Sequence, residues 1–297
     1  MPLDLFIQQL VNALSLGGIY ALLALGLAVV FSIIRLINFA HGEIMTVGGY
    51  GVFFSLLLGW PIPAAIVVGI SMSIIAAVAM ERLAFRAMKD ASVVSLLITS
   101  FAISEILKVL FQNGISARPK PIALPSELSG SYEVGGIVIG VIPTLSIAIT
   151  LISLAVLTAF LKRTTTGLAM RAAAEDFDMV RLVGVRAGGV VAAAFALSGL
   201  LAGIAAVIWT AQRGSVDPLM GFFPVLKAFI ATVLGGLGSL SGAVLGGFVV
   251  GAIEVFSQAF LPESLSPYRD AIVLGSVILI LLVRPEGLIP PARVDRS

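Results

Sequence analysis

Residues 5–34 read LFIQQLVNALSLGGIYALLALGLAVVFSII, a run without a single charged side chain that Asp4 and Arg35 bound on either side. A helix needs about 20 apolar residues to cross a bilayer core of about 30 Å. At about 1.5 Å per residue this run extends roughly 45 Å as a helix. It is therefore long enough to span a membrane, and we expect it to be either tilted or broken.

The composition of the whole chain agrees with a membrane protein. Of the 297 residues, 59% are hydrophobic and 11% are charged, and the mean hydropathy is +1.12. Soluble domains carry roughly 25% charged residues, so this chain has too few polar groups to cover a water-facing surface. These values exclude a soluble globular enzyme and a disordered chain. They leave enough apolar residues for about eight or nine transmembrane helices.

Residue counts exclude several kinds of functional site. The chain has no cysteine, so it has no disulfide framework and no thiolate metal site. His41 is the single histidine, which excludes a zinc helix of the HExxH type. The basic residues are scattered through loops, which argues against nucleic-acid binding. No phosphate-binding GxxxxGKS or GxxxxGKT loop is present, so any energy from ATP must come from a partner protein.

Further charge-free stretches predict the other helices. Proline and tryptophan within residues 59–63 mark a hairpin between two spans. The predicted helices cover residues 7–34, 43–58, 63–80, 92–112, 138–161, 188–210, 222–237, 240–260 and 268–284. The sequence therefore predicts an all-α fold, a polytopic membrane helix bundle of about eight or nine transmembrane helices. We expect residues 1–297 to form a single transmembrane domain, with the cytoplasmic segment 162–187 within it.

The distribution of lysine and arginine predicts the orientation, because basic residues favour cytoplasmic loops. Of the 18 basic residues, twelve belong to one set of loops, namely Arg35, Arg82, Arg86, Lys89, Lys162, Arg163, Arg171, Arg181, Arg186, Arg284, Arg293 and Arg296. We therefore expect the loops 81–91 and 162–187 and the C-terminus in the cytoplasm. By parity the N-terminus lies outside, provided that residues 43–58 cross fully. The start of the chain has no basic n-region, so we expect no removable signal peptide.

Polar residues follow directly on the first apolar run, over residues 35–43. One interpretation is an ordinary interfacial loop. The other is a broken or re-entrant helix, which a membrane tolerates only where the break is buried in protein or lines a cavity. The residues that shape a translocation path or hold the break are then Asn38, His41, Gly42 and Glu43. His41 beside Glu43 also fits a proton relay, but a hydrogen bond that holds the break is the simpler explanation.

The cytoplasmic segment 162–187 is rich in helix-favouring residues, and it predicts a short helix that Thr166 caps and Gly184 ends. The side chains expected to turn away from water are Leu168, Ala172, Met179 and Leu182. This helix either lies on the membrane surface or docks into a cleft on a cytoplasmic partner. The candidate docking residues are Arg171, Ala172, Glu175, Asp176, Arg181 and Gly184.

Glycines four residues apart predict close helix packing, because small residues let helix backbones approach in lipid. The candidates are Gly199, Gly203, Gly238, Gly242 and Gly246. The glycine cluster at 235–242 also marks a turn between two spans, where flexibility can serve gating.

Two acidic residues fall within predicted spans, where an ionisable group is costly and should face the bundle interior or water. Glu105 has Lys108 three residues away, and the two can neutralise one another. Glu254 has no local partner. It is therefore the better candidate for a residue on a transport path.

Five motifs occur in order along nearly the whole chain. They are NALSLGGIYALLALGL at 12–27, NFAHGE at 38–43, RAAAED at 171–176, GGLGSLSGA at 235–243 and RPEGL at 284–288. Together they resemble the permeases of branched-chain amino acid ABC transporters, specifically the shorter of the two paired permease subunits. The second and third motifs together are specific, whereas each glycine cluster alone is weak.

This resemblance implies a multi-pass protein of the bacterial inner membrane that imports branched-chain or related small amino acids by alternating access. It implies a heterodimer with a second permease subunit, two ATPase subunits that bind Mg-ATP and dock on the coupling segment, and a periplasmic binding protein that delivers substrate. The chain then has no cofactor and no enzymatic site of its own. Sister systems of the family make urea or short amides alternative substrates, and an ion-coupled secondary carrier with Glu105 or Glu254 as the ion site is the alternative from composition.

Overall fold

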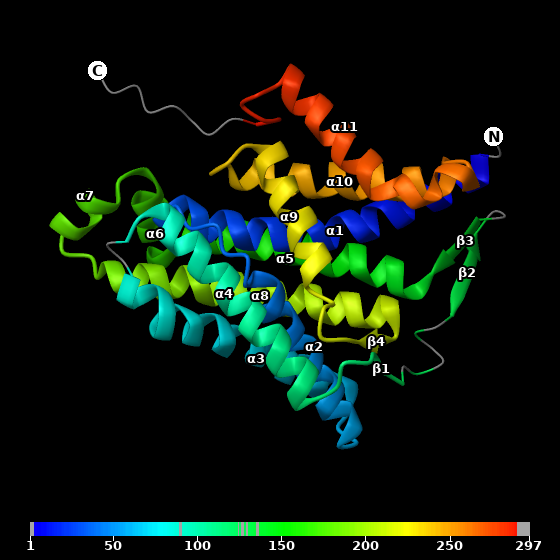
Figure 1. Cartoon of the computed structure of the whole chain (residues 1–297), viewed down its shortest axis with the longest axis horizontal. Coiled ribbons are helices and arrows are strands. Elements are labelled where there is room, and N and C mark those ends of the chain that lie inside the picture. Colours follow the sequence, from blue (N-terminus) through cyan, green and yellow to red (C-terminus); the bar gives the residue numbers. More distant parts are fainter. Residues whose placement is uncertain are drawn as a thin grey trace.

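The computed structural model describes residues 3–289 apart from 89–90, 124, 126–127, 129 and 135–136. Figure 1 shows long helices stacked side by side, most of them running between the same two ends of the molecule. The long helices are α1 (Leu3–Ile34), α3 (Ile62–Met80), α4 (Val93–Gly114), α5 (Val141–Arg163), α8 (Ala187–Arg213), α10 (Leu240–Phe260) and α11 (Arg269–Val283). Among the described residues, seven helices are long and apolar enough to cross a membrane. The predicted all-α membrane bundle is confirmed.

Two further predicted helices are present but short. α2 (His41–Leu57) has 17 residues and α9 (Phe222–Gly235) has 14. A helix of 17 residues extends about 25 Å, less than the bilayer core of about 30 Å. Each follows a non-helical segment, residues 35–40 and 214–221, that comes directly after a long helix. The predicted break near residues 35–43 is therefore confirmed, and α1 itself is one helix of 32 residues.

The helices α1, α2 and α3 repeat the plan of α8, α9 and α10 in the opposite direction. Each set has a long helix, a break, a short helix and a second long helix. α1 packs against α10, α8 packs correspondingly against α3, and α1 also contacts α8. In Figure 1, α1 starts at the end where the N-terminus lies, whereas α8 starts at the opposite end beside α7. Inverted repeats of this kind are common in transporters, whose sites lie between the repeats.

Small residues bring these helices together, as the four-residue spacing predicts. A carbon atom added to Gly199 or Gly203 of α8 would collide with α3, and one added to Gly242 or Gly246 of α10 would collide with the backbone of α9. Gly238 differs from the prediction. It lies in the turn between α9 and α10 at φ +92°, so backbone conformation and not helix packing explains this glycine.

Shorter elements lie at the two ends of the bundle. One end carries α6 (Thr165–Glu175) and α7 (Phe177–Leu182), and the opposite end carries two small antiparallel sheets (Figure 1). The sheets pair β1 (Lys120–Pro121) with β4 (Ser215–Val216) and β2 (Ser131–Val134) with β3 (Ile137–Gly140). Single turns of other helix types are the π-helix η1 (Glu81–Phe85) and the 3-10 helices η2 (Arg86–Met88) and η3 (Glu263–Tyr268). α1 is the most buried span and α11 the least, so the core surrounds α1.

Candidate functional site

A partly open cavity of about 1300 Å³ lies within the bundle. Its walls are the first half of α1, the start of α5, the end of α8, the segment 214–221, the start of α9, the end of α10 and the start of α11. The start of α5 and the ends of α8 and α10 lie at the end of the molecule that carries β2 and β3, away from α6 and α7 (Figure 1). Charged and amide side chains line the cavity. Polar groups at such depth are costly in a membrane protein and mark functional positions.

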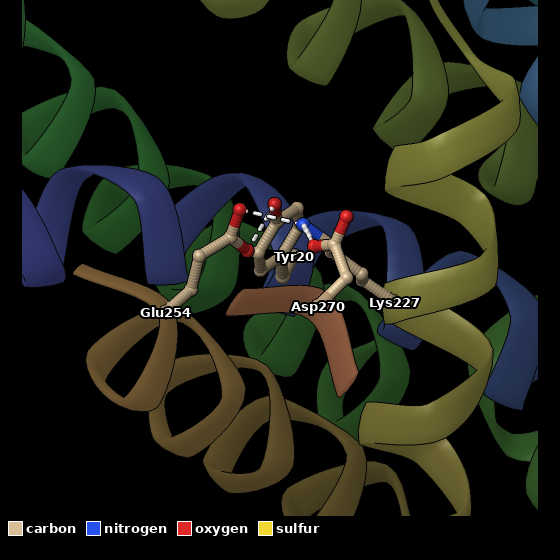
Figure 2. Close-up of polar contacts among 4 residues, drawn as sticks. All are labelled: Tyr20, Lys227, Glu254 and Asp270. Carbon is tan, nitrogen blue, oxygen red and sulfur yellow. Dashed lines mark hydrogen bonds and ion pairs between the residues drawn. The ribbon is translucent and has the colours of Figure 1, made fainter. Parts of the chain in front are cut away.

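Four side chains from four helices form a polar cluster in this cavity, shown in Figure 2. The Tyr20 hydroxyl of α1 donates a hydrogen bond to Glu254 Oε2 of α10 at 2.7 Å. Lys227 Nζ of α9 lies 2.5 Å from Glu254 Oε1 and 3.3 Å from Asp270 Oδ1 of α11. Lys227 is thus shared between two carboxylates, and the cluster connects α1, α9, α10 and α11.

The cluster is partly buried and lines the cavity. The side chains of Lys227 and Glu254 are 16% and 14% exposed, whereas that of Asp270 is 69% exposed. Ion pairs in partly buried surroundings are stronger than those at the surface, because the local dielectric constant is lower. With two carboxylates for one ammonium group, the cluster carries one excess negative charge and can accept a further cation.

Glu254, predicted as a path residue, lies at the centre of this cluster. Its partners Tyr20 and Lys227 are 234 and 27 positions away along the chain, so a search for a local partner does not find them. Sequence reasoning also misses Asp270 and the cavity-lining Arg213. The signal for Lys227 is a single basic residue inside the apolar segment 222–237.

The other predicted path residues lie at the break before α2, and none of them is among the described residues that line the cavity. Asn38, His41 and Glu43 are each at most 1% exposed. Asn38 Oδ1 accepts a hydrogen bond from the backbone N–H of Ala40 at 3.1 Å, which fixes the turn into α2. His41 Nδ1 lies 3.1 Å from the Ser198 hydroxyl of α8. These contacts hold the break, and a place for these residues on the path stays a prediction.

The two short helices meet where they begin. A carbon atom added to Gly42 would lie 2.5 Å from the carbonyl oxygen of Gly221, and one added to Gly221 would collide with the carbonyl group of Gly42. No residue with a side chain fits at either position without moving a backbone.

Glu43 follows Gly42 directly and is buried. Ser104 and Lys108 of α4 are near its carboxylate, and one of its oxygens has no hydrogen-bond partner among the described residues. Lys108 Nζ in turn lies 2.6 Å from Glu105 Oε1, which confirms the predicted Glu105–Lys108 pair.

The predicted coupling segment forms two helices and not one. α6 ends at Glu175 and α7 begins at Phe177, because Asp176 between them accepts a hydrogen bond from the backbone of Met179 at 3.0 Å and caps α7. Asp176 and Arg181 have further contacts within the chain. Gly184 follows α7 at φ +82°, in agreement with the predicted helix end.

The start of α6 also differs from the prediction. Thr164, and not Thr166, caps the helix, because its hydroxyl accepts a hydrogen bond from the backbone of Gly167 at 3.0 Å. This places the first turn two residues earlier than expected.

Of the four side chains expected to turn away from water, three do not pack against the rest of the chain, and whether a membrane or a partner covers them stays a prediction. Leu168, Met179 and Leu182 are 58–80% exposed, and Ala172 is half-buried. Where α6 packs against α1, α5 and α8 and α7 packs against α8, other residues are buried, namely Gly167, Met170, Ala173 and Val180. The outer surface combines the exposed apolar side chains with charged ones, and we call it the α6–α7 surface: Leu168, Arg171, Glu175, Met179, Arg181, Leu182 and Val183.

The ends of the bundle separate the basic residues as predicted. η1, the end of α5 and the α6–α7 surface lie together at one end, and the start of α1 lies at the other (Figure 1). Lys89, Arg293 and Arg296, and with them the predicted cytoplasmic C-terminus, lie outside the described residues.

Comparison with known proteins identifies the family. The sequence model of a family described as "branched-chain amino acid transport system / permease component" matches residues 9–282. Two proteins described as high-affinity branched-chain amino acid transport system permeases are similar over nearly their full length. BraD of Pseudomonas aeruginosa is 35% identical over 98% of each chain, and LivH of Escherichia coli is 34% identical over 98% of this chain and 97% of LivH. LivM of Salmonella typhimurium is 28% identical over 95% of this chain and 70% of LivM. The chain therefore belongs to the family of branched-chain amino acid transport permeases.

Proposed function

We propose that this chain is the transmembrane permease subunit of an ATP-driven importer of branched-chain or related small amino acids in a bacterial inner membrane. The observation that carries the proposal is the polar cavity within an apolar helix bundle, at the end away from the α6–α7 surface. A cavity on one side and a docking surface on the other are the two parts that such a subunit requires. The membership in the permease family gives the substrate class.

The orientation follows from the charges. We place the α6–α7 surface in the cytoplasm because basic residues gather at that end. The cavity then faces the periplasm, and the N-terminus lies outside. The short helix α2 does not disturb this parity, because residues 35–40 return into the bundle before α2 runs outward.

The α6–α7 surface supports docking of the ATPase subunits that bind Mg-ATP. Met179, Leu182 and Val183 offer exposed apolar anchors, and Arg171 and Glu175 offer a charged rim. Protein interfaces combine an apolar core with a polar rim in this way. A second permease subunit completes the membrane part as a heterodimer, and a periplasmic binding protein delivers the amino acid at the cavity end.

The transport step follows from how the coupling segment packs. α6 contacts α1, α5 and α8, and each of these helices contributes to the cavity wall. Closure of the ATPase pair displaces α6 and α7, and this displacement reaches the cavity through three packed helices. The cavity then closes to the periplasm and opens to the cytoplasm, which is alternating access.

Uptake of labelled leucine tests the proposal in a strain of the source organism that lacks this gene. Restoring the gene should restore uptake, ATP depletion should abolish it, and collapse of the ion gradient alone should leave it. Unlabelled valine and isoleucine should compete. Uptake that survives ATP depletion and fails without the ion gradient indicates a secondary carrier, and competition by urea or acetamide alone indicates an amide importer.

A further inference from the structure

The charges that line the cavity are balanced but are not all paired with one another. Three basic and three acidic side chains line it, namely Arg213, Lys227, Arg269, Asp217, Glu254 and Asp270. A wall of this kind has no preference for a ligand with a net charge. It suits a ligand that carries one positive and one negative group, as a zwitterionic α-amino acid does.

Arg213 is a cation that is available to a ligand. Its guanidinium group lies over the Trp209 ring, 4.6 Å from the ring centroid, and within the described part of the chain it forms no ion pair. It is exposed at the end of α8, on the cavity wall. A guanidinium group binds a carboxylate through two parallel hydrogen bonds, so it suits an α-carboxylate better than an ammonium group does.

The Lys227 cluster provides the complementary charge. Glu254 and Asp270 share Lys227 as their partner, so one carboxylate charge is left for a second cation. Tyr20 contacts the cluster directly, because its hydroxyl donates a hydrogen bond to Glu254, and it is within electrostatic range of Arg213. An anion-binding group and a cation-binding group thus line the same cavity as this tyrosine.

Apolar side chains lie close to these charges. Leu219 and Phe223, in the segment that leads into α9 and in its first turn, line the same cavity and are 43% and 60% exposed. Such exposure offers contact area for an apolar side chain of the ligand.

Building on the proposed function, we propose that this wall is a transient binding site for zwitterionic α-amino acids, with Arg213 holding the α-carboxylate and Glu254 with Asp270 holding the α-ammonium group. The entering ammonium group takes the place of a contact that Lys227 makes in the empty site, so one ion pair is exchanged for another. Such an exchange gives weak binding. Weak binding is what a transport path requires, because the ligand must also leave.

Trp209 offers a direct readout, because it stacks on Arg213 and the chain has 2 tryptophans. We would purify the full chain with its partner subunits in lipid nanodiscs, labelled with 5-fluorotryptophan, and assign the Trp209 resonance by its loss in Trp209→Phe. L-Leucine should shift this resonance in a saturable way. 4-Methylpentanoate lacks the ammonium group and 3-methylbutylamine lacks the carboxylate, so each should bind at least about tenfold more weakly.

Substitutions then test the carboxylate-binding part and the ammonium-binding part of the site separately. Arg213→Gln and Glu254→Gln should each weaken leucine binding by at least about tenfold. Glu105→Gln is the matched control, because it removes the charge of another glutamate paired with lysine, outside the cavity, and it should leave binding unchanged. The amide that Glu254→Gln introduces can still accept the Tyr20 hydrogen bond. If this variant nevertheless fails to assemble, Asp270→Asn on an exposed side chain carries the same test.

The outcomes separate this site from the proposed function. Equal binding of leucine and both analogues, or unchanged binding in Arg213→Gln and Glu254→Gln, overturns the site. Normal leucine uptake by the same complex with no shift at Trp209 also overturns the site and leaves the proposed function intact. A saturable shift with no ATP-driven uptake overturns the proposed function instead.

Discussion

The two breaks in the bundle are built alike and surrounded differently. Each follows a long helix at a residue with left-handed backbone, Arg35 at φ +56° and Gly214 at φ +63°, and each leads into a short helix. The start of α2 is sealed, with His41 and Glu43 at 0% and 1% exposure, whereas the start of α9 opens onto the cavity with Phe223 at 60%. Polar residues at a helix break therefore do not tell which break faces a transport path. The surroundings decide it.

The largest effect should come from the contact that the two breaks share. Gly221→Val places a side chain against the backbone of Gly42, which should cost about 3 kcal/mol because one of the two backbones must shift. The folded fraction and melting temperature of the purified complex measure this. Gly275→Ala is the control, since a carbon there meets no atom within 4 Å. Equal melting temperatures for the two variants contradict the close contact.

A substitution at the sealed break before α2 should lower the stability of the protein but should leave transport unchanged. His41→Ala removes a fully buried ring and leaves the Ser198 hydroxyl unpaired, which should cost about 2–3 kcal/mol. Leucine uptake per folded molecule should remain near that of the wild type. A loss of uptake in a complex with an unchanged melting temperature indicates that His41 belongs to the path after all.

A substitution in the cavity, onto which the break before α9 opens, should lower transport more than stability. In Glu254→Gln, the amide oxygen still accepts from Tyr20, and Lys227 keeps Asp270 as its partner, so the stability loss should be about 1 kcal/mol. Uptake should fall several-fold, because the cavity loses a negative charge. Melting curves and initial uptake rates of the same preparation measure both. A large loss of stability with unchanged uptake per folded molecule assigns Glu254 to structure alone.

The smallest effect on stability should come from the α6–α7 surface, which belongs to neither break. Glu175 is exposed, so Glu175→Arg should change the stability of the chain by less than about 0.5 kcal/mol. It should nevertheless lower co-purification of the ATPase subunits and leucine-stimulated ATP hydrolysis. Wild-type assembly, hydrolysis and uptake in this variant rule out the docking role.

Charge and hydropathy predict the helices well because each apolar run has to be buried in lipid or protein wherever it lies. The same reasoning predicts close packing at Gly199 and Gly203, since small residues at that spacing serve one purpose in a helix. The spacing does not distinguish Gly238, which the backbone conformation of the turn requires, from the glycines that allow helices to pack closely.

The cavity cannot be predicted in this way. The Tyr20–Glu254 contact joins residues 234 positions apart, and its existence depends on α1 packing against α10. The sequence likewise does not tell which face of α6 packs on the chain itself. Amphipathic spacing identifies two faces of a short helix, and the packing on α1, α5 and α8 decides which of them is buried within the chain.

One contact at the far end of α9 bears on how the chain is made. The backbone N–H groups of Leu288 and Ile289 donate to the carbonyl oxygens of Leu234 and Gly235 at 2.8 and 3.0 Å, and these carbonyls lack partners within their own helix. The last turn of α9 is therefore completed by residues that leave the ribosome more than fifty positions later. During synthesis the last turn of α9 therefore lacks these two hydrogen bonds until residue 289 has emerged.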